Sequence, residues 1–271
     1  MNNIIGFIGC GNMGKAIAQG MLSAGIVEGK QVMICDHHPE NLASMQARYH
    51  VELKEQAEVA RASDVLILAV KPHLYATVIE EIRDLVKKDV VIVDIAAGQS
   101  IANVQRLFKS DMKVARAMPN TPAQVQAGMS ALCFSENVEQ AQRSFIYDLF
   151  TSFGRCEIID EKIINSASSA SGASPAFVYM FIEAMADGAV RLGMKRSTAY
   201  TFCAQAVLGA AKMVLESGEH PGALKDAVCS PGGSTIEGVA VLEERGMRSA
   251  VMDALLACEE KSKKMAEANE K

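Results

Sequence analysis

The feature that most restricts the fold of this chain is a glycine-spaced turn directly after its first apolar run. The run Ile4–Ile8 predicts a short strand, and Lys15–Ala24 carries apolar residues at helical spacing. A strand–turn–helix unit with a G-x-G-x-x-G turn is typical of proteins that bind a dinucleotide. The turn consists of Gly9, Cys10, Gly11, Asn12, Met13 and Gly14.

Each glycine of this turn has its own task. Gly9 permits the tight turn, Gly11 lets the backbone approach a pyrophosphate, and Gly14 lets the helix pack closely against the strand. The pyrophosphate then lies on free amides at the positive end of the helix dipole. A glycine turn without a ligand is the alternative, and the strand before it and the helix after it both disfavour that interpretation.

The first 160 residues alternate short apolar runs with helix-spaced segments. Near-continuous apolar runs are typical of parallel strands that are covered on both faces. Strand–helix–strand repetition predicts right-handed crossovers. We therefore expect a Rossmann-type, doubly wound and mostly parallel sheet in residues 1–160. The expected strands are Ile4–Ile8, Val32–Cys35, Val65–Val70, Val90–Ile95, Lys113–Met118, Gly128–Phe134 and Cys156–Ile159; the clearest helical segments are Lys15–Ala24, Asn41–Tyr49 and Leu74–Val86.

Residues 161–271 have a different, helical character. Ser174 and Pro175 together predict a helix start, with serine as the cap and proline in the first turn. The segment Ala176–Leu192 is apolar on nearly all sides, so the helix must be covered all round. A part of about 110 residues cannot enclose it alone, and we expect an all-α dimerisation domain in which a second subunit covers this helix. Further helices are expected at Thr198–Glu216, Ala223–Val228, Thr235–Glu244 and Met247–Ala266.

The composition excludes several classes of protein. A net charge of −5 disfavours a nucleic-acid binder, which needs a basic face. The seven cysteines form no C-x-x-C pair and are typical of a reducing compartment. The start of the chain lacks the basic region of a signal peptide, and no run reaches the length of a membrane span. We expect a cytoplasmic protein without a membrane partner.

The end of the second expected strand bears on the choice of cofactor. Asp36 lies 22 residues after Gly14, where an acidic side chain bonds the ribose 2′-hydroxyl of NAD. His37 and His38 follow, and either could contact the 2′-phosphate of NADP. These residues leave the choice between the two cofactors open, and plain solvent-facing histidines are an equal alternative.

A second glycine turn stands at Ser230–Thr235. Ser234 and Glu237 have the S-x-x-E spacing of a capping box, which predicts a helix start at this point. Two glycines before it leave the backbone amides uncovered, so this helix end could hold a small carboxylate. The local sequence fits an ordinary capped turn at least as well.

As a whole, the chain resembles the pyrroline-5-carboxylate reductase family nearly from end to end. The resemblance rests on Gly6–Gly14, Leu68–Pro72, Ala96–Gly98, Met118–Pro122, Ser171–Gly172, Pro175–Phe177 and above all Ser230–Thr235. It implies a Rossmann domain followed by a helical domain that interlocks with that of a partner in a homodimer, or in a higher assembly built from dimers. It also favours the carboxylate interpretation of the second glycine turn.

The resemblance further implies hydride transfer from NADPH, or from NADH, to the C=N carbon of 1-pyrroline-5-carboxylate, which gives L-proline. The substrate would lie between the nicotinamide and the partner's glycine-rich turn. Thr235 would place its hydroxyl near the substrate nitrogen, and Gly232, Gly233 and Ser234 would complete the substrate site. The cofactor residues would be those of Gly9–Gly14 together with Asp36, His37, Gln56, Ala69, Val70, Lys71, Pro72, Ala96 and Ala97.

Three positions depart from the family pattern. Ala173-Ser174 stands where Ser-Gly is frequent, and Gln56 stands where an asparagine commonly contacts the cofactor. Asp36-His37 replaces an Asn-Arg-like pair, which puts recognition of a 2′-phosphate in doubt.

Two other functions compete with this interpretation. A β-hydroxyacid dehydrogenase has a similar domain plan, but it relies on a lysine near the start of its long helix, and Ser166–Leu192 contains none. A regulatory protein that binds nucleotide without turnover is the other, and Thr235 with its glycine turn argues against it.

Overall fold

The computed structural model describes residues 3–269, which divide into two compact units. The first unit contains the residues up to Ala173 and those from Cys258 onwards. The second unit is Ser174–Ala257. Each unit is described by itself.

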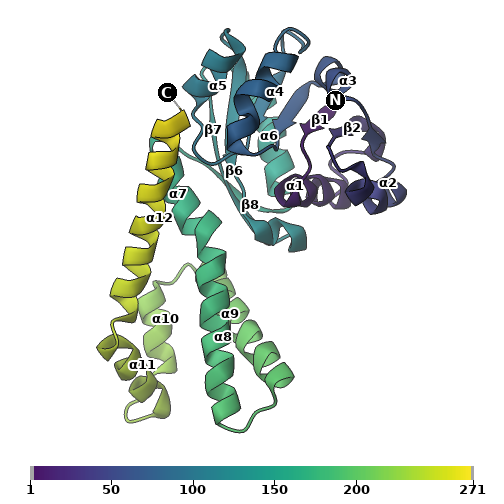
Figure 1. Ribbon diagram of the computed structural model, residues 1–271. Coiled ribbons are helices and arrows are strands. Elements are labelled where there is room, and N and C mark those ends of the chain that lie inside the picture. Colours follow the sequence, from purple (N-terminus) through teal and green to yellow (C-terminus); the bar gives the residue numbers. More distant parts are fainter. Residues whose placement is uncertain (1–2, 270–271) are drawn as a thin grey trace. The chain divides into compact units, whose positions relative to one another are not determined.

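The first unit is built on an eight-stranded sheet in the order β3-β2-β1-β4-β5-β6-β7-β8 (Figure 1). All neighbours are parallel except β6 and β7, which are antiparallel. The expected doubly wound, mostly parallel sheet is confirmed. The strands are β1 Ile5–Ile8, β2 Val32–Cys35, β3 Glu52–Leu53, β4 Val65–Leu68, β5 Val91–Asp94, β6 Lys113–Met118, β7 Gly128–Phe134 and β8 Gly154–Ile158.

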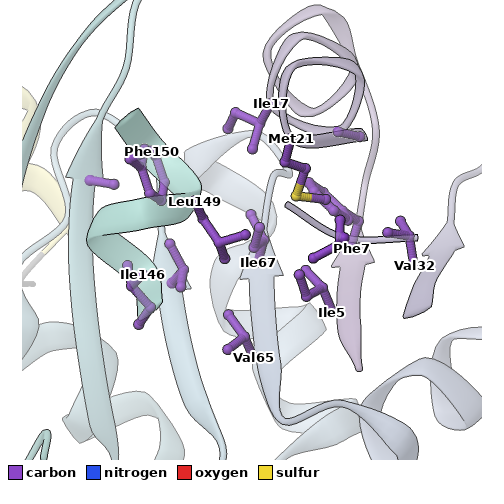
Figure 2. Packing of buried hydrophobic residues seen from close by; sticks show 14 of the residues in the cluster. Ile5, Phe7, Ile17, Met21, Val32, Val65, Ile67, Ile146, Leu149 and Phe150 are labelled. Carbon is purple, nitrogen blue, oxygen red and sulfur yellow. The ribbon is translucent and has the colours of Figure 1, made fainter. Parts of the chain in front are cut away.

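Helices lie on both faces of this sheet, which explains the continuous apolar runs. Side chains alternate along a strand, so Val65 and Ile67 of β4 belong to one core cluster while Leu66 and Leu68 belong to the other. Figure 2 shows the first of these clusters. The helices of this unit are α1 Asn12–Ser23, α2 Ala43–Tyr49, α3 Gln56–Ala62, α4 Tyr75–Ile82, α5 Ile101–Phe108, α6 Gln140–Thr151 and α7 Ile164–Ala167.

The first cluster is formed by two helices that are far apart in the sequence. Ile17 and Met21 come from α1, and Ile146 and Leu149 come from α6 (Figure 2). All four are essentially inaccessible to water and pack over strand residues such as Phe7. The α1 helix, which opens at the glycine turn, is therefore anchored along its length, so its first turn is held in a fixed place.

The second unit is helical, as expected, and leaves much apolar surface uncovered. Its core cluster contains only Ala186, Ala199 and Cys203 as buried members. Tyr179 is 61% exposed and Phe202 is 64% exposed. A helical unit with so small a core needs a further surface to cover it. Its helices are α8 Ser174–Arg191, α9 Arg196–Ser217, α10 Pro221–Val228, α11 Ser234–Glu244 and the first part of α12 Met247–Asn269.

The helix start predicted at Ser174 is confirmed by the first residue of α8, but the predicted serine cap is wrong. The α7 helix continues through a π-helical segment, Ser168–Ala173, directly into α8, so Ser174 is not a cap. A proline inside a helix has no N–H for the carbonyl one turn earlier. In this structure the Ser171 carbonyl accepts a hydrogen bond of 2.9 Å from the side-chain amide of Asn120 instead. The missing bond is supplied from outside the helix, and the helix does not break.

Candidate functional site

The carboxyl ends of four neighbouring strands lie level with one another. Ile8 at the end of β1 is in register with Cys35 of β2 and with Leu68 of β4, and Leu68 is in register with Asp94 of β5. The turns that follow these strands therefore meet at one edge of the sheet. The chain runs from β1 to β2 on one side and returns to β4 on the other, so this edge is the topological switch point, where open α/β sheets bind ligands.

The glycine turn at this edge has the geometry of a pyrophosphate site. Gly9 has a φ of +82°, and a Cβ there would lie 2.8 Å from the Ala69 carbonyl oxygen. Gly14 packs so closely that its Cβ would lie 3.3 Å from that of Ala69. Gly11, by contrast, is exposed, and a Cβ on it would meet no atom within 4 Å. The space beside Gly11 is open to a ligand, as the sequence predicts.

The helix after this turn begins without a side-chain cap. Gly11 is the N-cap of α1, and no side chain accepts a hydrogen bond there. The first amides of a helix have no partner within the helix. Uncovered amides and the helix dipole together attract phosphate, so the residues present fit a dinucleotide.

Asp36, after β2, is bonded to the glycine turn itself. Its Oδ2 accepts a hydrogen bond of 2.5 Å from the Cys10 N–H, and its Oδ1 accepts one of 2.8 Å from the His38 N–H. The His38 ring lies 3.1 Å from the carboxylate of Glu40. His37 is exposed. The structure thus brings Asp36 and His37 to the same edge of the sheet as the glycine turn.

The residues predicted after β4 and β5 lie at this edge as well. The Ala69 N–H donates to the Ile8 carbonyl at 2.9 Å, which ties the start of Ala69–Pro72 to the end of β1. Lys71 is exposed at the N-terminal end of a short 3₁₀ turn. Ala96 and Ala97 follow Asp94. Gln56 differs from these, because its side-chain amide donates to Glu81 of α4 at 2.7 Å.

A buried polar pair beneath this edge was missed by the sequence analysis. The Tyr75 hydroxyl lies 2.8 Å from the Leu68 carbonyl and 2.6 Å from Asp94 Oδ1, which also accepts from the Ala96 N–H at 2.9 Å. Burial raises the pKa of Asp94 to about 6, although the hydrogen bonds of Tyr75 and Ala96 and the charge of Arg116 lower it. This pair holds the ends of β4 and β5 together below the turns that follow them. The sequence did contain a signal for this pair, namely the acidic Asp94 at the end of the otherwise apolar strand β5.

The sequence analysis also missed a buried arginine. Arg116 on β6 has only 4% of its side chain exposed and forms an ion pair of 3.3 Å with Glu161. Glu161 in turn accepts from the Ile101 N–H at 2.8 Å. The pair fixes the start of α5 relative to the end of the sheet.

The second glycine turn, in the helical unit, is built differently from the prediction. The α11 helix begins at Ser234 with Gly233 as its N-cap and without a side-chain cap. The predicted capping box of Ser234 and Glu237 is therefore wrong. The helix begins one residue earlier than predicted, so Ser234 lies in its first turn and Gly233 occupies the N-cap position. Gly232 has a φ of +69°, and the Gly233 N–H donates to the Ser230 carbonyl at 3.0 Å. Ser234 and Thr235 are both exposed in the first turn.

Together, these features define a class: dinucleotide-binding proteins with a Rossmann-type sheet followed by a helical unit. Comparison with known proteins narrows it. Residues 161–265 match the family model for pyrroline-5-carboxylate reductase dimerisation, and residues 4–98 match the model for NADP oxidoreductase, coenzyme F420-dependent. The chain is 48% identical over 266 residues to the pyrroline-5-carboxylate reductase of Escherichia coli strain K12, covering 98% of this chain and 99% of the relative.

More distant relatives agree over the same length. The reductase of Methanosarcina acetivorans is 39% identical over 265 residues, covering 97% of this chain and 98% of the relative. The crystal structure of Plasmodium falciparum pyrroline carboxylate reductase with NADP bound matches with a TM-score of 0.89 at 31% identity and covers 98% of both chains. This chain belongs to the pyrroline-5-carboxylate reductase family. The family and the fold expected from the sequence are confirmed; the contacts of the individual site residues stay predictions.

Proposed function

We propose that this chain reduces the C=N bond of 1-pyrroline-5-carboxylate to L-proline with hydride from NADPH. The observation that carries the proposal is the open space beside Gly11, at an uncapped helix end on the switch edge of the sheet. The end-to-end relatives support the same reaction, since they are named as pyrroline-5-carboxylate reductases.

At the nucleotide end, the amides of Gly9–Gly14 bind the pyrophosphate in this proposal. Ala69–Pro72 and Ala96–Ala97 line the nicotinamide side, because they follow the strands next to β1 on the other side of the switch point. A bound NADPH supplies the hydride. The Tyr75–Asp94 pair keeps these two turns at a constant separation, which matters because hydride transfer depends on near-contact between donor and acceptor.

The substrate carboxylate, in this proposal, lies on the amides of Gly233, Ser234 and Thr235 at the start of α11. Gly232 and Gly233 leave these amides uncovered, and the helix dipole favours a negative charge there. The Thr235 hydroxyl bonds the ring nitrogen. Once the imine is protonated, its carbon accepts hydride without a general base, so positioning and electrostatics are sufficient for catalysis.

The protein acts as a homodimer, in line with its match to the family's dimerisation model. We infer that the apolar surface of α8 and α9 packs against a second copy of the chain, and that a higher assembly is built from such dimers. Among the described residues, α9 is by length and composition alone apolar enough to cross a membrane. We assign that surface to the subunit contact instead. All seven cysteines are free thiols, which supports a cytoplasmic location.

The test is an assay of NADPH oxidation in the presence of 1-pyrroline-5-carboxylate, followed by the absorbance of the reduced nicotinamide and by the formation of proline. We expect one proline for each NADPH consumed. Binding of NADPH without turnover would indicate a regulatory nucleotide-binding protein. Turnover of β-hydroxyacids with NADP, but not of the imine, would indicate the related dehydrogenase class.

A further inference from the structure

Beneath the turns that follow β4 and β5, the Tyr75 hydroxyl contacts two other oxygens. Its oxygen lies 2.8 Å from the Leu68 carbonyl oxygen and 2.6 Å from Asp94 Oδ1. Leu68 ends β4 and Asp94 ends β5, so the hydroxyl joins the strand ends that lead into Ala69–Pro72 and Ala96–Ala97. Tyr75 is 1% exposed and Asp94 is completely inaccessible to water. The contacts are closed to solvent, so the protons that these oxygens share can be counted.

Two hydrogen bonds among these three oxygens need two protons. A carbonyl oxygen and an ionised carboxylate only accept, whereas a phenol has a single proton to donate. With Asp94 ionised, Tyr75 can donate to only one of its two partners at a time. With Asp94 protonated, the carboxyl group donates to Tyr75, and Tyr75 donates to the Leu68 carbonyl. The two distances therefore fit a protonated Asp94.

An ionised Asp94 is unfavourable for a second reason. Its Oδ2 has no hydrogen-bond partner among residues 3–269, so a carboxylate would hold part of its charge on an unpaired buried oxygen. Burial is the largest influence and raises the pKa of Asp94 to about 6, although the hydrogen bonds of Tyr75 and Ala96 and the charge of Arg116 lower it. The negative charge of Glu161 contributes a smaller increase in this pKa.

The other groups packed around Asp94 do not take over the role of this proton. Arg116 lies beside Asp94 in register on β6, but its guanidinium is paired with Glu161 at 3.3 Å. Burial, and then the charge of Glu161, raise the pKa of Cys133 on β7 to about 12, so its thiol stays neutral. Tyr75 is therefore the neighbour with which Asp94 shares a proton.

We propose that Tyr75 is a positioning residue for the nicotinamide end of the cofactor, and that it acts together with a proton on Asp94. The inference rests on the proposed function in taking Ala69–Pro72 and Ala96–Ala97 as the nicotinamide side. With the proton in place, both strand ends are tied to Tyr75. When the proton leaves, Tyr75 donates to the charged carboxylate, the stronger acceptor, and the Leu68 carbonyl loses its donor. The turn after β4 is then held less firmly, which weakens binding of the nicotinamide ring.

This role makes binding at the nicotinamide end depend on pH. Burial holds the pKa of Asp94 at about 6, so both ties are present below that pH and the tie to Leu68 is lost above it. The affinity for the nicotinamide ring is therefore highest in mild acid and falls as the pH rises through this range. Because cofactor and proton favour each other, bound cofactor also raises the pH at which Asp94 ionises.

The experiment compares NADPH with 2′-phospho-ADP-ribose, which lacks only the nicotinamide ring. NADPH binding is followed by its fluorescence in freshly mixed samples, and the fragment is measured by its displacement of NADPH. The ratio of the two affinities isolates the nicotinamide ring, because the 2′-phosphate titrates in both ligands alike. We expect this ratio to fall by about five- to tenfold between pH ~5.5 and pH ~8 in the wild type.

Two variants and a matched control assign the effect to these residues. Asp94→Asn has no proton to lose, so its ratio should not change with pH. Tyr75→Phe removes both hydrogen bonds, so its ratio should be low and equally independent of pH. Asp89→Asn is the control, since this carboxylate lies just before the other end of β5 with 84% of its side chain exposed. It should keep the wild-type pH dependence within about twofold.

A wild-type ratio that is constant or rises with pH would overturn the inference, and this measurement requires no variant to fold. A pH dependence of wild-type size in Asp94→Asn or Tyr75→Phe would overturn it as well, as would the loss of that dependence in Asp89→Asn. The proposed function fails differently, because NADPH would then not bind or would bind without reduction of the imine. The binding measurements need no imine, so the two failures can be told apart.

Discussion

At the scale of the residue, Asp94 is a carboxyl group enclosed within the sheet. It is fully buried, and its Oδ2 has no hydrogen-bond partner within the described part of the chain. Burial raises its pKa from 3.8 to about 6 in the folded protein. The folded state therefore holds this proton more tightly than the unfolded chain does, and stability falls as the pH rises from about 4 to about 6.

Asp94→Asn should accordingly stabilise the protein near neutral pH. The amide oxygen still accepts from Tyr75 and Ala96, and no charge has to be buried. We expect the free energy of unfolding to rise by about 3 kcal/mol at pH ~7.5 and to match the wild type at pH ~4, where the native carboxyl is protonated. Urea unfolding at the two pH values and one fixed protein concentration measures both quantities. A gain of the same size at both would assign the effect to packing instead.

Gly11→Val should weaken nucleotide binding while the fold survives. A side chain at this position meets open space within the described residues, so it does not disturb packing. It does enter the space that the pyrophosphate needs. We expect a loss of at least about tenfold in NADPH affinity with a nearly unchanged melting temperature, and a smaller loss for Gly11→Ala. Equal affinities of the folded variants and the wild type would remove this turn from the cofactor site.

Thr235→Ala should lower turnover more than stability. Thr235 is exposed in the first turn of α11, and the N-cap is Gly233, so its hydroxyl does not cap the helix. A hydrogen bond to a charged group contributes about 1.5–3 kcal/mol, so kcat/KM should fall by roughly ten- to a hundredfold. Thr235→Ser keeps the hydroxyl and should retain most of the activity. A large drop in melting temperature for Thr235→Ala would instead assign a structural role to this residue.

At the scale of the element, the long helix through Pro175 depends on a bond from outside. The Asn120 side chain donates to the Ser171 carbonyl at 2.9 Å and accepts from the Met129 N–H at 2.9 Å. It thereby ties the start of β7 to the π-helical segment, where the ordinary pattern of helix bonds is interrupted.

Asn120→Ala should therefore destabilise the protein markedly. It leaves a carbonyl and an amide unpaired at a position where Asn120 itself is only 7% exposed. Each unpaired buried group costs about 1–3 kcal/mol, so a loss of about 2–6 kcal/mol is expected in chemical denaturation. Asn41→Ala, at an exposed asparagine, should change stability by less than about 0.5 kcal/mol. A loss for Asn120→Ala as small as that of the control would show that other partners serve both groups.

The strands were predictable because their two faces are both buried. Val65–Leu68 contributes to both core clusters. Such a strand has no polar face, so its sequence is a continuous apolar run that is easy to identify. The two-residue β3 and the short α3 and α5 carry too few residues for a period to be evident. The antiparallel direction of β7 follows from its pairing with β6, which no local pattern encodes.

The candidate site was predictable in part. The glycine turn carries its function in its own spacing, and its geometry follows from local backbone needs. The bond from Cys10 to Asp36 joins residues 26 positions apart, and that from Tyr75 to Asp94 joins residues 19 apart. Such contacts arise only once the sheet is assembled. The start of α11 differed from the prediction by one residue, because a glycine can serve as the N-cap as readily as a serine.

At the scale of the whole molecule, the helical unit is incomplete as a single chain. The exposed apolar side chains of α8 belong to the helix that is apolar on nearly all sides in the sequence, and α9 exposes further apolar side chains. A cluster with three buried residues cannot supply a stable core alone. Dimerisation is therefore part of folding for this unit, and its stability should depend on protein concentration.

The proposed sharing of active sites between subunits can be tested with Gly11→Val and Thr235→Ala in mixed dimers. Suppose that each site takes the glycine turn of one subunit and the Ser230–Thr235 turn of its partner. A dimer of one Gly11→Val chain and one Thr235→Ala chain then has one site with both substitutions and one with neither. We expect this mixed dimer, purified through two different tags, to show about half the wild-type kcat per dimer.

The reverse arrangement gives the opposite outcome and serves as the control. A dimer of a wild-type chain and a chain with both substitutions carries one substitution in each shared site, so its activity should be as low as that of the single variants. If each site were formed within one subunit, the two results would be exchanged. The dimer of a wild-type chain and a doubly substituted chain would then retain half the activity, and the dimer of two singly substituted chains would lose it. The comparison therefore distinguishes a shared site from a self-contained one, because each single substitution is expected to leave its site with far less than half of the wild-type activity.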